Sequence, residues 1–423
     1  MYIYVLIIGV ILAVIGLAII GFRVRQVARR IHPSIKKYFV ISLNVAEIKQ
    51  NADARDRTFP LRLGKSTVNV LVEPEPISEE GTEIVEIQED GETIRQSISD
   101  TVTYAGRIVG AEETSDVRLT ITNDMLAGYV IYGEDWWFIE PLKKFRIDAD
   151  ISDYLVYRTK DLRFKFNLED DVIPVREEQT EPGSLPELPE GSGYLPPPHQ
   201  VGPNIGILLV ADPEYEQQAK TIGTVWHQEQ MSVLHTVNGL YKKNLGCWFT
   251  PKVWILNYKD LKNCNADKLL VDLEKVVKSV WGDLRLLKTR MDKNAEVAHL
   301  TSGKDLDGST LGIAYQPGVY SLSQQQLFWL GGGGGFGGPP NLAFQNMMIM
   351  AHELGHNFNG LHEEADEWCV THFIWCWDYE RSLMWPTFYE DNNDWISDGS
   401  LNAKHNNRQR IKNNMASGRN HNF

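Results

Sequence analysis

Hydrophobic residues dominate the first 22 positions, where Met1 to Phe22 contain no charged side chain. A run of this length can cross a bilayer as a helix. Apolar residues on every side of that helix argue against a core helix, which would keep one polar face. No clear small-residue cleavage site follows. The pattern predicts a transmembrane anchor, or an uncleaved signal, over residues 1–22, with a cleaved signal peptide as the alternative.

Residues 31–173 are rich in β-branched and aromatic side chains separated by short turn signals. Val117, Leu119 and Ile121 alternate with polar residues, and Asn123-Asp124 then reads as a turn. This period of two is typical of half-buried strands. We therefore expect a β-rich domain over 31–173, and we see no obvious catalytic cluster in it.

Between residues 174 and 204 the composition changes to proline, glutamate and glycine. Proline lacks a backbone donor, and the run offers little apolar surface to bury. The sequence predicts a linker at 174–204. Its prolines include Pro182, Pro186, Pro189, Pro196, Pro197 and Pro198.

Beyond the linker, short apolar runs alternate with amphipathic stretches, which predicts an α/β (α+β) domain over 205–423. A cap and first-turn proline at Asp212-Pro213 begin a long helix that we expect to reach about Asn244. Asn265 caps a second expected helix that runs through Trp281. The expected strands are Ile205–Val210, Val253–Leu256, Val297–Leu300 and Leu311–Tyr315.

The strongest chemical pattern lies in an apolar stretch, residues 342–362, which reads LAFQNMMIMAHELGHNFNGLH. His352 and His356 are four residues apart, so both imidazoles project from one face of a helix. That spacing lets two nitrogens bind one zinc ion at about 2.0–2.1 Å. Glu353 stands beside the first of them, where its carboxylate can reach a metal-bound water without replacing it.

The residues after this helix complete the pattern. Gly360 can take a left-handed conformation and end the helix, so that His362 approaches the same metal as a third ligand. Three nitrogens leave one tetrahedral position open, as catalytic zinc requires. A structural helix with two satisfied histidines would not explain Gly360 or His362. The sequence therefore predicts a single catalytic Zn²⁺.

A methionine that could form part of the metal site follows the zinc motif in the sequence. Met384 lies in the run Ser382 to Pro386, SLMWP, and is the natural candidate for a methionine turn beneath the metal. A thioether can pack under the ligand histidines without competing for zinc.

The four cysteines fall into two close pairs in sequence, Cys247 with Cys264 and Cys369 with Cys376. Two local disulfides, which need an oxidising compartment, are one reading of these pairs. Four reduced thiols are the alternative, because sequence alone does not fix connectivity.

The segments HELGHNFNGLH and SLMWP resemble the metzincins, and within them the adamalysin or reprolysin-like peptidases. The similarity extends over most of residues 204–417. Ile207 to Asp212 resembles the family's opening strand, and Ala298–Gly303 with Leu311–Tyr315 resembles its upper edge strand. The stretch from Ala105 to Leu142 is similar to a pro-domain of that group.

This resemblance implies a metzincin-like catalytic domain with a twisted mixed sheet and an active-site helix. It also implies that Glu353 is the general base. Protein or peptide substrates would lie extended along Gly312, Ile313 and Ala314. Trp385 and Pro386 would line the pocket beside the scissile bond.

Two features depart from the family pattern. Glu363 follows the third histidine, where adamalysins usually have aspartate. No cysteine precedes Cys247, so a pro-domain cysteine cannot ligate the zinc. Any restraint by residues 31–173 must then come from surface burial or from a group other than a thiol.

The distribution of charged residues indicates which partners the protein can bind and where its catalytic domain lies. The formal net charge of −14 argues against nucleic acid, which needs clustered Lys and Arg. Basic residues after the apolar run favour a cytoplasmic catalytic domain, whereas paired cysteines favour the outside. We expect a single-pass membrane protein with an extracytoplasmic catalytic domain, with secretion or a cytoplasmic location as alternatives. The basic residues are Arg23, Arg25, Arg29, Arg30, Lys36 and Lys37.

The leading function is thus a zinc-dependent endopeptidase. The first alternative is a catalytically silent, membrane-anchored binding protein that keeps zinc for structure. The second is a receptor function carried by the β-rich domain. The intact Glu353 and the open metal position favour the endopeptidase. Oligomeric state is not predicted.

Overall fold

The computed structural model describes residues 31, 35–98, 102–162, 166–167, 172–174, 204–282, 296–307, 310–316, 318–325, 342–358 and 387–388. The predicted membrane anchor at 1–22 and almost all of the predicted linker lie outside these residues. Within the described ranges, no helix is both long and apolar enough to span a bilayer.

The N-terminal half contains an antiparallel sheet of eight strands, here called the β-rich sheet. The predicted alternation is present, since Val117, Leu119 and Ile121 are all buried on one face. Helix α2 (Val45–Asp53) packs on that same face. In spatial order the strands are β1 (Tyr38–Ser42), β10 (Asp153–Arg158), β9 (Asp135–Pro141), β8 (Leu126–Tyr132), β7 (Ser115–Ile121), β6 (Thr103–Ile108), β3 (Ser66–Pro74) and β2 (Thr58–Leu63).

The second sheet, here called the catalytic sheet, is mixed and also has eight strands. Strands β17, β15, β13, β14 and β4 run parallel, and β16 is antiparallel to β17. In spatial order the strands are β12 (Val172–Pro174), β16 (Gly312–Gln316), β17 (Tyr320–Gln324), β15 (Val297–Ser302), β13 (Asn204–Ala211), β14 (Trp248–Asn257), β4 (Glu83–Ile87) and β5 (Thr93–Ser97).

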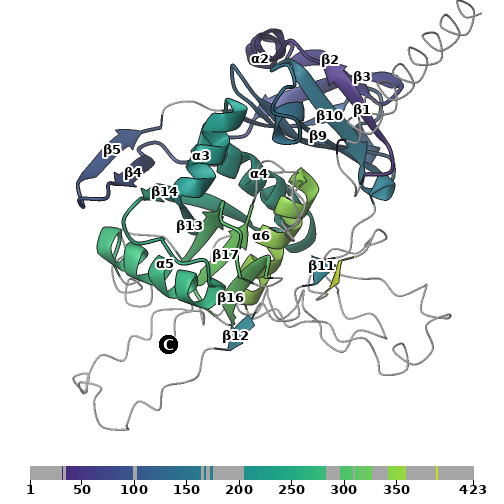
Figure 1. Cartoon of the computed structure of the whole chain (residues 1–423). Coiled ribbons are helices and arrows are strands. Elements are labelled where there is room, and N and C mark those ends of the chain that lie inside the picture. The colour runs from purple at the N-terminus through teal and green to yellow at the C-terminus, as the bar shows by residue number, and fades with distance from the viewer. Residues whose placement is uncertain are drawn as a thin grey trace, which may run out of the picture.

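Helices cover both faces of the catalytic sheet, as Figure 1 shows. Helix α5 (Ala266–Val280) packs on one face through Leu269, Leu273 and Val277. Helices α3 (Pro213–Ile222), α4 (Trp226–Leu245) and α6 (Ala343–Asn357) pack on the other face. A mixed sheet between helix layers agrees with the predicted α/β (α+β) domain.

The predicted long helix from Asp212 to about Asn244 is wrong in one respect. Gly223 takes a left-handed conformation at the end of α3, and α4 begins three residues later at Trp226. The predicted helix from Asn265 is confirmed, because the Asn265 side chain accepts the Lys268 N–H at the start of α5. The four predicted strands correspond to β13, β14, β15 and β16.

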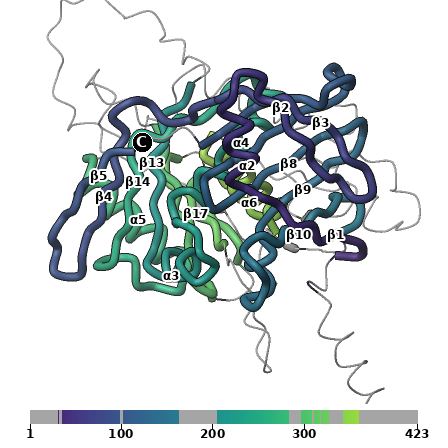
Figure 2. Tube along the Cα trace, turned by 90° about the horizontal axis from the view of Figure 1, so that it is seen from above, coloured from purple at the N-terminus to yellow at the C-terminus, as the bar shows by residue number. Residues whose placement is uncertain are grey.

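The hairpin of β4 and β5 departs from the expected organisation. It belongs by sequence to the stretch 31–173, yet β4 pairs in parallel with β14 of the catalytic sheet. Figures 1 and 2 show the hairpin beside β14, well away from β1 and β10. Strand β12 likewise joins the catalytic sheet at its other edge. A two-stranded pairing links β11 (Phe166–Asn167) to β18 (Thr387–Phe388).

The predicted disulfide between Cys247 and Cys264 is wrong. Cys247 is buried directly before β14, whereas Cys264 is exposed beyond the other end of that strand. Ten extended residues span roughly 33 Å, and a disulfide needs α-carbons within about 7 Å. Cys369 and Cys376 lie outside the described residues.

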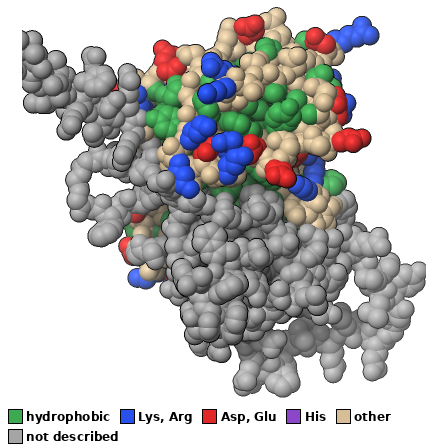
Figure 3. Space-filling view, turned by 90° about the vertical axis from the view of Figure 1, so that its right-hand side faces the viewer, with side chains coloured by type: hydrophobic (Ala, Val, Ile, Leu, Met, Phe, Trp, Pro, Cys, Tyr) green, Lys and Arg blue, Asp and Glu red, His purple; other side chains and the backbone are tan. Residues whose placement is uncertain are grey.

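The described surface mixes side-chain types. On the face shown in Figure 3, Lys and Arg side chains lie among Asp, Glu and hydrophobic ones. Three short 3-10 turns complete the described elements, at Glu112–Thr114, Leu142–Lys144 and Thr159–Asp161.

Candidate active site

Helix α6 carries the predicted zinc motif and is enclosed by the rest of the fold. Its apolar positions, among them Met347, Met350 and Leu354, are fully buried against α4 and the catalytic sheet. His352, Glu353 and His356 are buried as well. An apolar helix that buries polar side chains such as these must use them for chemistry or for hydrogen bonds, because burying them otherwise costs free energy.

The two histidines converge on one point. The Nε2 atoms of His352 and His356 lie 2.9 Å apart, and the two rings are nearly perpendicular. Two nitrogens on a tetrahedral zinc at 2.0–2.1 Å would be separated by about 3.3 Å. The pair therefore fits one zinc ion with a small adjustment of the side chains.

The third donor predicted from sequence, His362, lies outside the described residues. Among the described residues, no group of three His, Cys, Asp or Glu side chains is arranged to hold a metal ion. Met384, Trp385 and Pro386 also lie outside that part of the chain.

Glu353 lies against strand β16 of the catalytic sheet. A β-carbon added at Gly312 on β16 would stand 2.7 Å from the Glu353 Cδ and 2.8 Å from its Cγ. Ordinary carbon–carbon contacts are about 3.5–4.0 Å. Gly312 is therefore required for the carboxylate to occupy this position. The sequence had assigned Gly312 only to substrate binding, and the structure brings it to the predicted general base.

The C-terminal end of α6 is tied to the same edge of the sheet. The Asn357 side-chain amide donates to the backbone oxygens of Tyr315 at 3.1 Å and Tyr320 at 3.0 Å. From the other side, the Tyr241 hydroxyl on α4 donates to the Ala351 carbonyl at 2.8 Å. These bonds fix the helix relative to β16, and with it the distance between the histidine pair and the strand.

The N-terminal end of α6 is capped by the β-rich sheet, a contact that the sequence did not predict. Glu140 on β9 accepts the Ala343 N–H at 3.0 and 3.2 Å, and the Tyr157 hydroxyl at 2.8 Å. Leu342 has no capping side chain of its own, although its N–H donates to Gln345. A carboxylate in this position satisfies N–H groups that an α-helix leaves unpaired, and it complements the helix dipole.

Strand β16 has partners on both sides. It pairs antiparallel with β17 through Gly312, Ile313 and Ala314. On its other side, Val172–Pro174 of β12 run parallel to Ala314–Gln316. The strand predicted to bind substrate is therefore covered by a segment from the end of the predicted pro-domain.

His299, on β15, is a fully buried core residue. Its ring lies between the hydroxyl groups of Ser321 at 2.8 Å and Ser323 at 2.9 Å. Burial lowers the pKa of His299 to about 3, so the ring is neutral at physiological pH.

One comparison with known proteins covers the region that contains these residues. Residues 203–396 match the family model described as metallo-peptidase family M12, of the reprolysin type. This region of the chain is similar to the metallopeptidases of that family.

A solved structure, metalloproteinase-II from Bacteroides fragilis, is similar to this chain at 13% sequence identity. The match covers 88% of this chain and 95% of that one, with a TM-score of 0.45.

Proposed function

We propose that this protein is a zinc-dependent endopeptidase. The observation that carries the proposal is the convergence of His352 and His356 beside Glu353, next to strand β16. The match to the M12 metallopeptidase model supports it.

The proposed division of roles follows from the chemistry of the side chains. His352, His356 and His362 would hold the ion. When bound, zinc supplies a Lewis acid that polarises a carbonyl and acidifies water. Glu353 takes a proton from the attacking water and delivers it to the leaving amine nitrogen. Backbone groups of Gly312 to Ala314 hold the peptide extended by strand pairing.

We further propose that residues 31–173 keep the enzyme latent until the linker at 174–204 is cut. β12 and an extended substrate would need the same side of β16, because β17 occupies the other side. A chain cut after Pro174 would free the end of β12, and three paired residues give little cohesion on their own.

Glu353→Gln is the decisive test of catalysis. The variant should lose peptide hydrolysis and still bind about one zinc ion per chain, since the carboxylate acts as base and not as ligand. Casein cleavage and metal content would be measured on the full chain, before and after cutting at a protease site engineered between residues 180 and 200. Undiminished hydrolysis by the cut variant would refute the assignment.

The same preparation tests latency and the alternative function. The cut wild-type chain should cleave a peptide faster than the intact chain, and equal rates would refute latency. A wild-type protein that binds zinc and cleaves nothing in either form would favour the silent binding protein.

A further inference from the structure

The β-rich sheet uses both of its faces to bury apolar side chains. One face packs on α2. On the other face, Tyr129, Phe138 and Leu155 belong to the same apolar cluster as helices α4 and α6. Phe138 on β9 meets Phe344 on α6 edge to face, with ring centroids 5.5 Å apart. The two halves of the chain therefore share one core, and separating them would expose large apolar surfaces to water.

A buried charge cluster accompanies this core at the start of α6. Lys144, directly after β9, bonds Glu229 on α4 at 2.6 Å and lies 3.8 Å from Glu140. All three side chains are at least 95% buried. Burial raises the pKa of Glu140, while Lys144 and the Ala343 N–H act in the opposite direction. Pulling the sheet away would leave Glu229 without its lysine and the first turn of α6 without its cap, and both changes are unfavourable.

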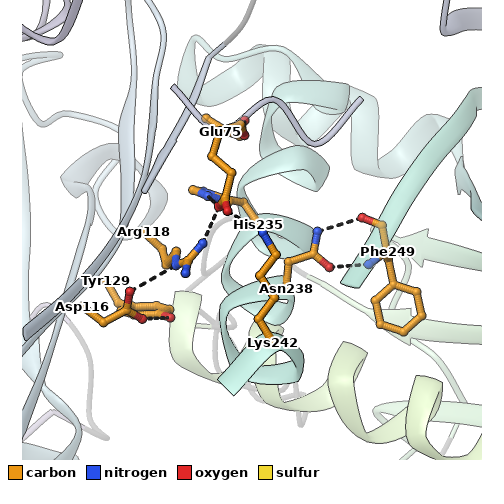
Figure 4. Close-up of polar contacts among 9 residues, drawn as sticks. Glu75, Asp116, Arg118, Tyr129, His235, Asn238, Lys242 and Phe249 are labelled. Atoms are coloured by element: carbon orange, nitrogen blue, oxygen red, sulfur yellow. Dashed lines mark hydrogen bonds and ion pairs between the residues drawn. The ribbon is translucent and has the colours of Figure 1, made fainter. Parts of the chain in front are cut away.

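A second cluster joins the halves further along α4, as Figure 4 shows. Glu75, which follows β3, bonds Arg118 on β7 together with His235 and Lys242 on α4. Burial alone would raise the pKa of Glu75, but His235, Arg118 and Lys242 outweigh it and hold that pKa well below its usual range. Glu75 is therefore an anion that bonds to both halves at once.

The backbone of α4 also comes close to side chains of the β-rich sheet at this junction. A β-carbon at Gly239 on α4 would lie 3.1 Å from the Arg118 side chain and 3.2 Å from the Tyr129 ring. On the far side of the molecule, the five residues of β4 pair with β14 along its last five positions. These contacts do not depend on the linker or on β12.

We infer that the β-rich sheet stays bound after the linker is cut, as a permanent support in which Glu140 caps the active-site helix. Activation then separates β12 from β16, while the β-rich sheet and the β4–β5 hairpin stay in place. The activation step rests on the proposed function, whereas the retention of the sheet does not.

Gel filtration of the cut chain tests retention without any measurement of activity. The full chain, cut at the engineered site between 180 and 200, should elute at the volume of the intact chain. Both fragments should appear in that fraction on a denaturing gel. Separate elution of the two fragments under non-denaturing conditions would overturn the inference, and it would leave the peptidase proposal standing.

The role of Glu140 has its own test, hydrogen–deuterium exchange at the first turn of α6. Glu140→Leu removes the acceptor and should speed exchange at residues 343–345 by about fivefold or more, the usual effect of a lost cap. Glu140→Gln keeps one acceptor oxygen and should restore much of the protection. If Glu140 served only to fill space, leucine would be tolerated. Exchange at residues 343–345 would then be slower in Glu140→Leu than in Glu140→Gln.

Controls keep the test interpretable. Glu134→Leu, in the exposed turn between β8 and β9, makes the same change away from α6 and should leave exchange there unchanged. If Glu140→Leu does not fold, Tyr157→Phe removes the hydroxyl that donates to Glu140. That hydroxyl also accepts the Phe344 N–H, so exchange at Ala343, whose N–H donates to Glu140, is the readout for this variant. Unchanged exchange at Ala343 in a folded Tyr157→Phe or Glu140→Leu protein would refute the capping role.

Discussion

Replacing Gly312 with alanine should displace Glu353, the proposed general base, while leaving the proposed metal ligands in place. The new β-carbon would lie 2.7 Å from the Glu353 Cδ, and an ordinary contact is about 3.5 Å. The carboxylate must therefore move by roughly 0.8 Å or change rotamer. Since α6 is held at both ends, the helix itself cannot give way easily.

We expect the substitution to slow the chemical step of catalysis. A misplacement of about 1 Å can reduce catalysis by about 100-fold, and general-base catalysis as a whole contributes about 10²–10⁴-fold. We expect kcat/KM of the cut Gly312→Ala enzyme to fall by about 100-fold or more. Zinc content should not change. Stability should fall by about 1–3 kcal/mol, the usual cost of overpacking.

Leu322→Val is the matched control, on the neighbouring strand β17. Leu322 packs in the opposite core, with α5, so this change should cost stability and not activity. The assays are casein or peptide cleavage, zinc content, and unfolding in denaturant. A folded Gly312→Ala enzyme with wild-type kcat/KM would refute the placement of Glu353 against β16.

Three further predictions follow from the site, the fold and the sequence. His362→Ala should lose zinc, as measured by metal analysis, and with it peptide hydrolysis. Full zinc occupancy in this variant would mean that another residue is the third ligand. Burial raises the pKa of Asp212 from 3.8 to about 6, against opposing hydrogen bonds from Ser302 and Gly303. Between about pH 4 and 6 the folded protein thus holds a proton that the unfolded chain has released, so this group makes stability fall as pH rises. Asp212→Asn should gain stability relative to wild type across that window, by up to about 3 kcal/mol, and a constant difference between the two urea midpoints would contradict this. Finally, we expect the catalytic domain to face away from the cytoplasm, with Cys369 and Cys376 bridged. Mass spectrometry of unreduced peptides would test the disulfide, and protease added to intact cells would test the location of the domain. Free thiols, together with full protection of the domain from that protease, would reverse this prediction.

The centre of the site could be predicted from the sequence because its geometry is local. His352, Glu353 and His356 lie within five residues, and one helical turn brings the two imidazoles to one face whatever surrounds them. The capping of Asn265 and the alternation in β7 were predictable for the same reason.

Features that depend on distant segments could not be predicted in this way. Glu140 caps a helix 203 residues further along the chain, and nothing in its local sequence marks it as a capping residue. Cys247 and Cys264 are close in sequence, but the extended strand between them places them far apart. The turn at Gly223 was missed because one glycine inside an amphipathic stretch does not by itself end a helix.

The position of the β4–β5 hairpin has a consequence for synthesis on the ribosome. The hairpin is complete at Ser97, but its partner β14 ends only at Asn257, 160 residues later. At about 5–20 residues per second, the hairpin waits on the order of 10–30 s for that partner. Ile84, Val85 and Ile87, buried in the finished protein, are solvent-accessible on the nascent chain during this interval. An isolated two-stranded hairpin is at best marginally stable, so the nascent chain exposes an unpaired strand edge until these 160 residues have been added. Chaperone demand should therefore peak before residue 257 emerges.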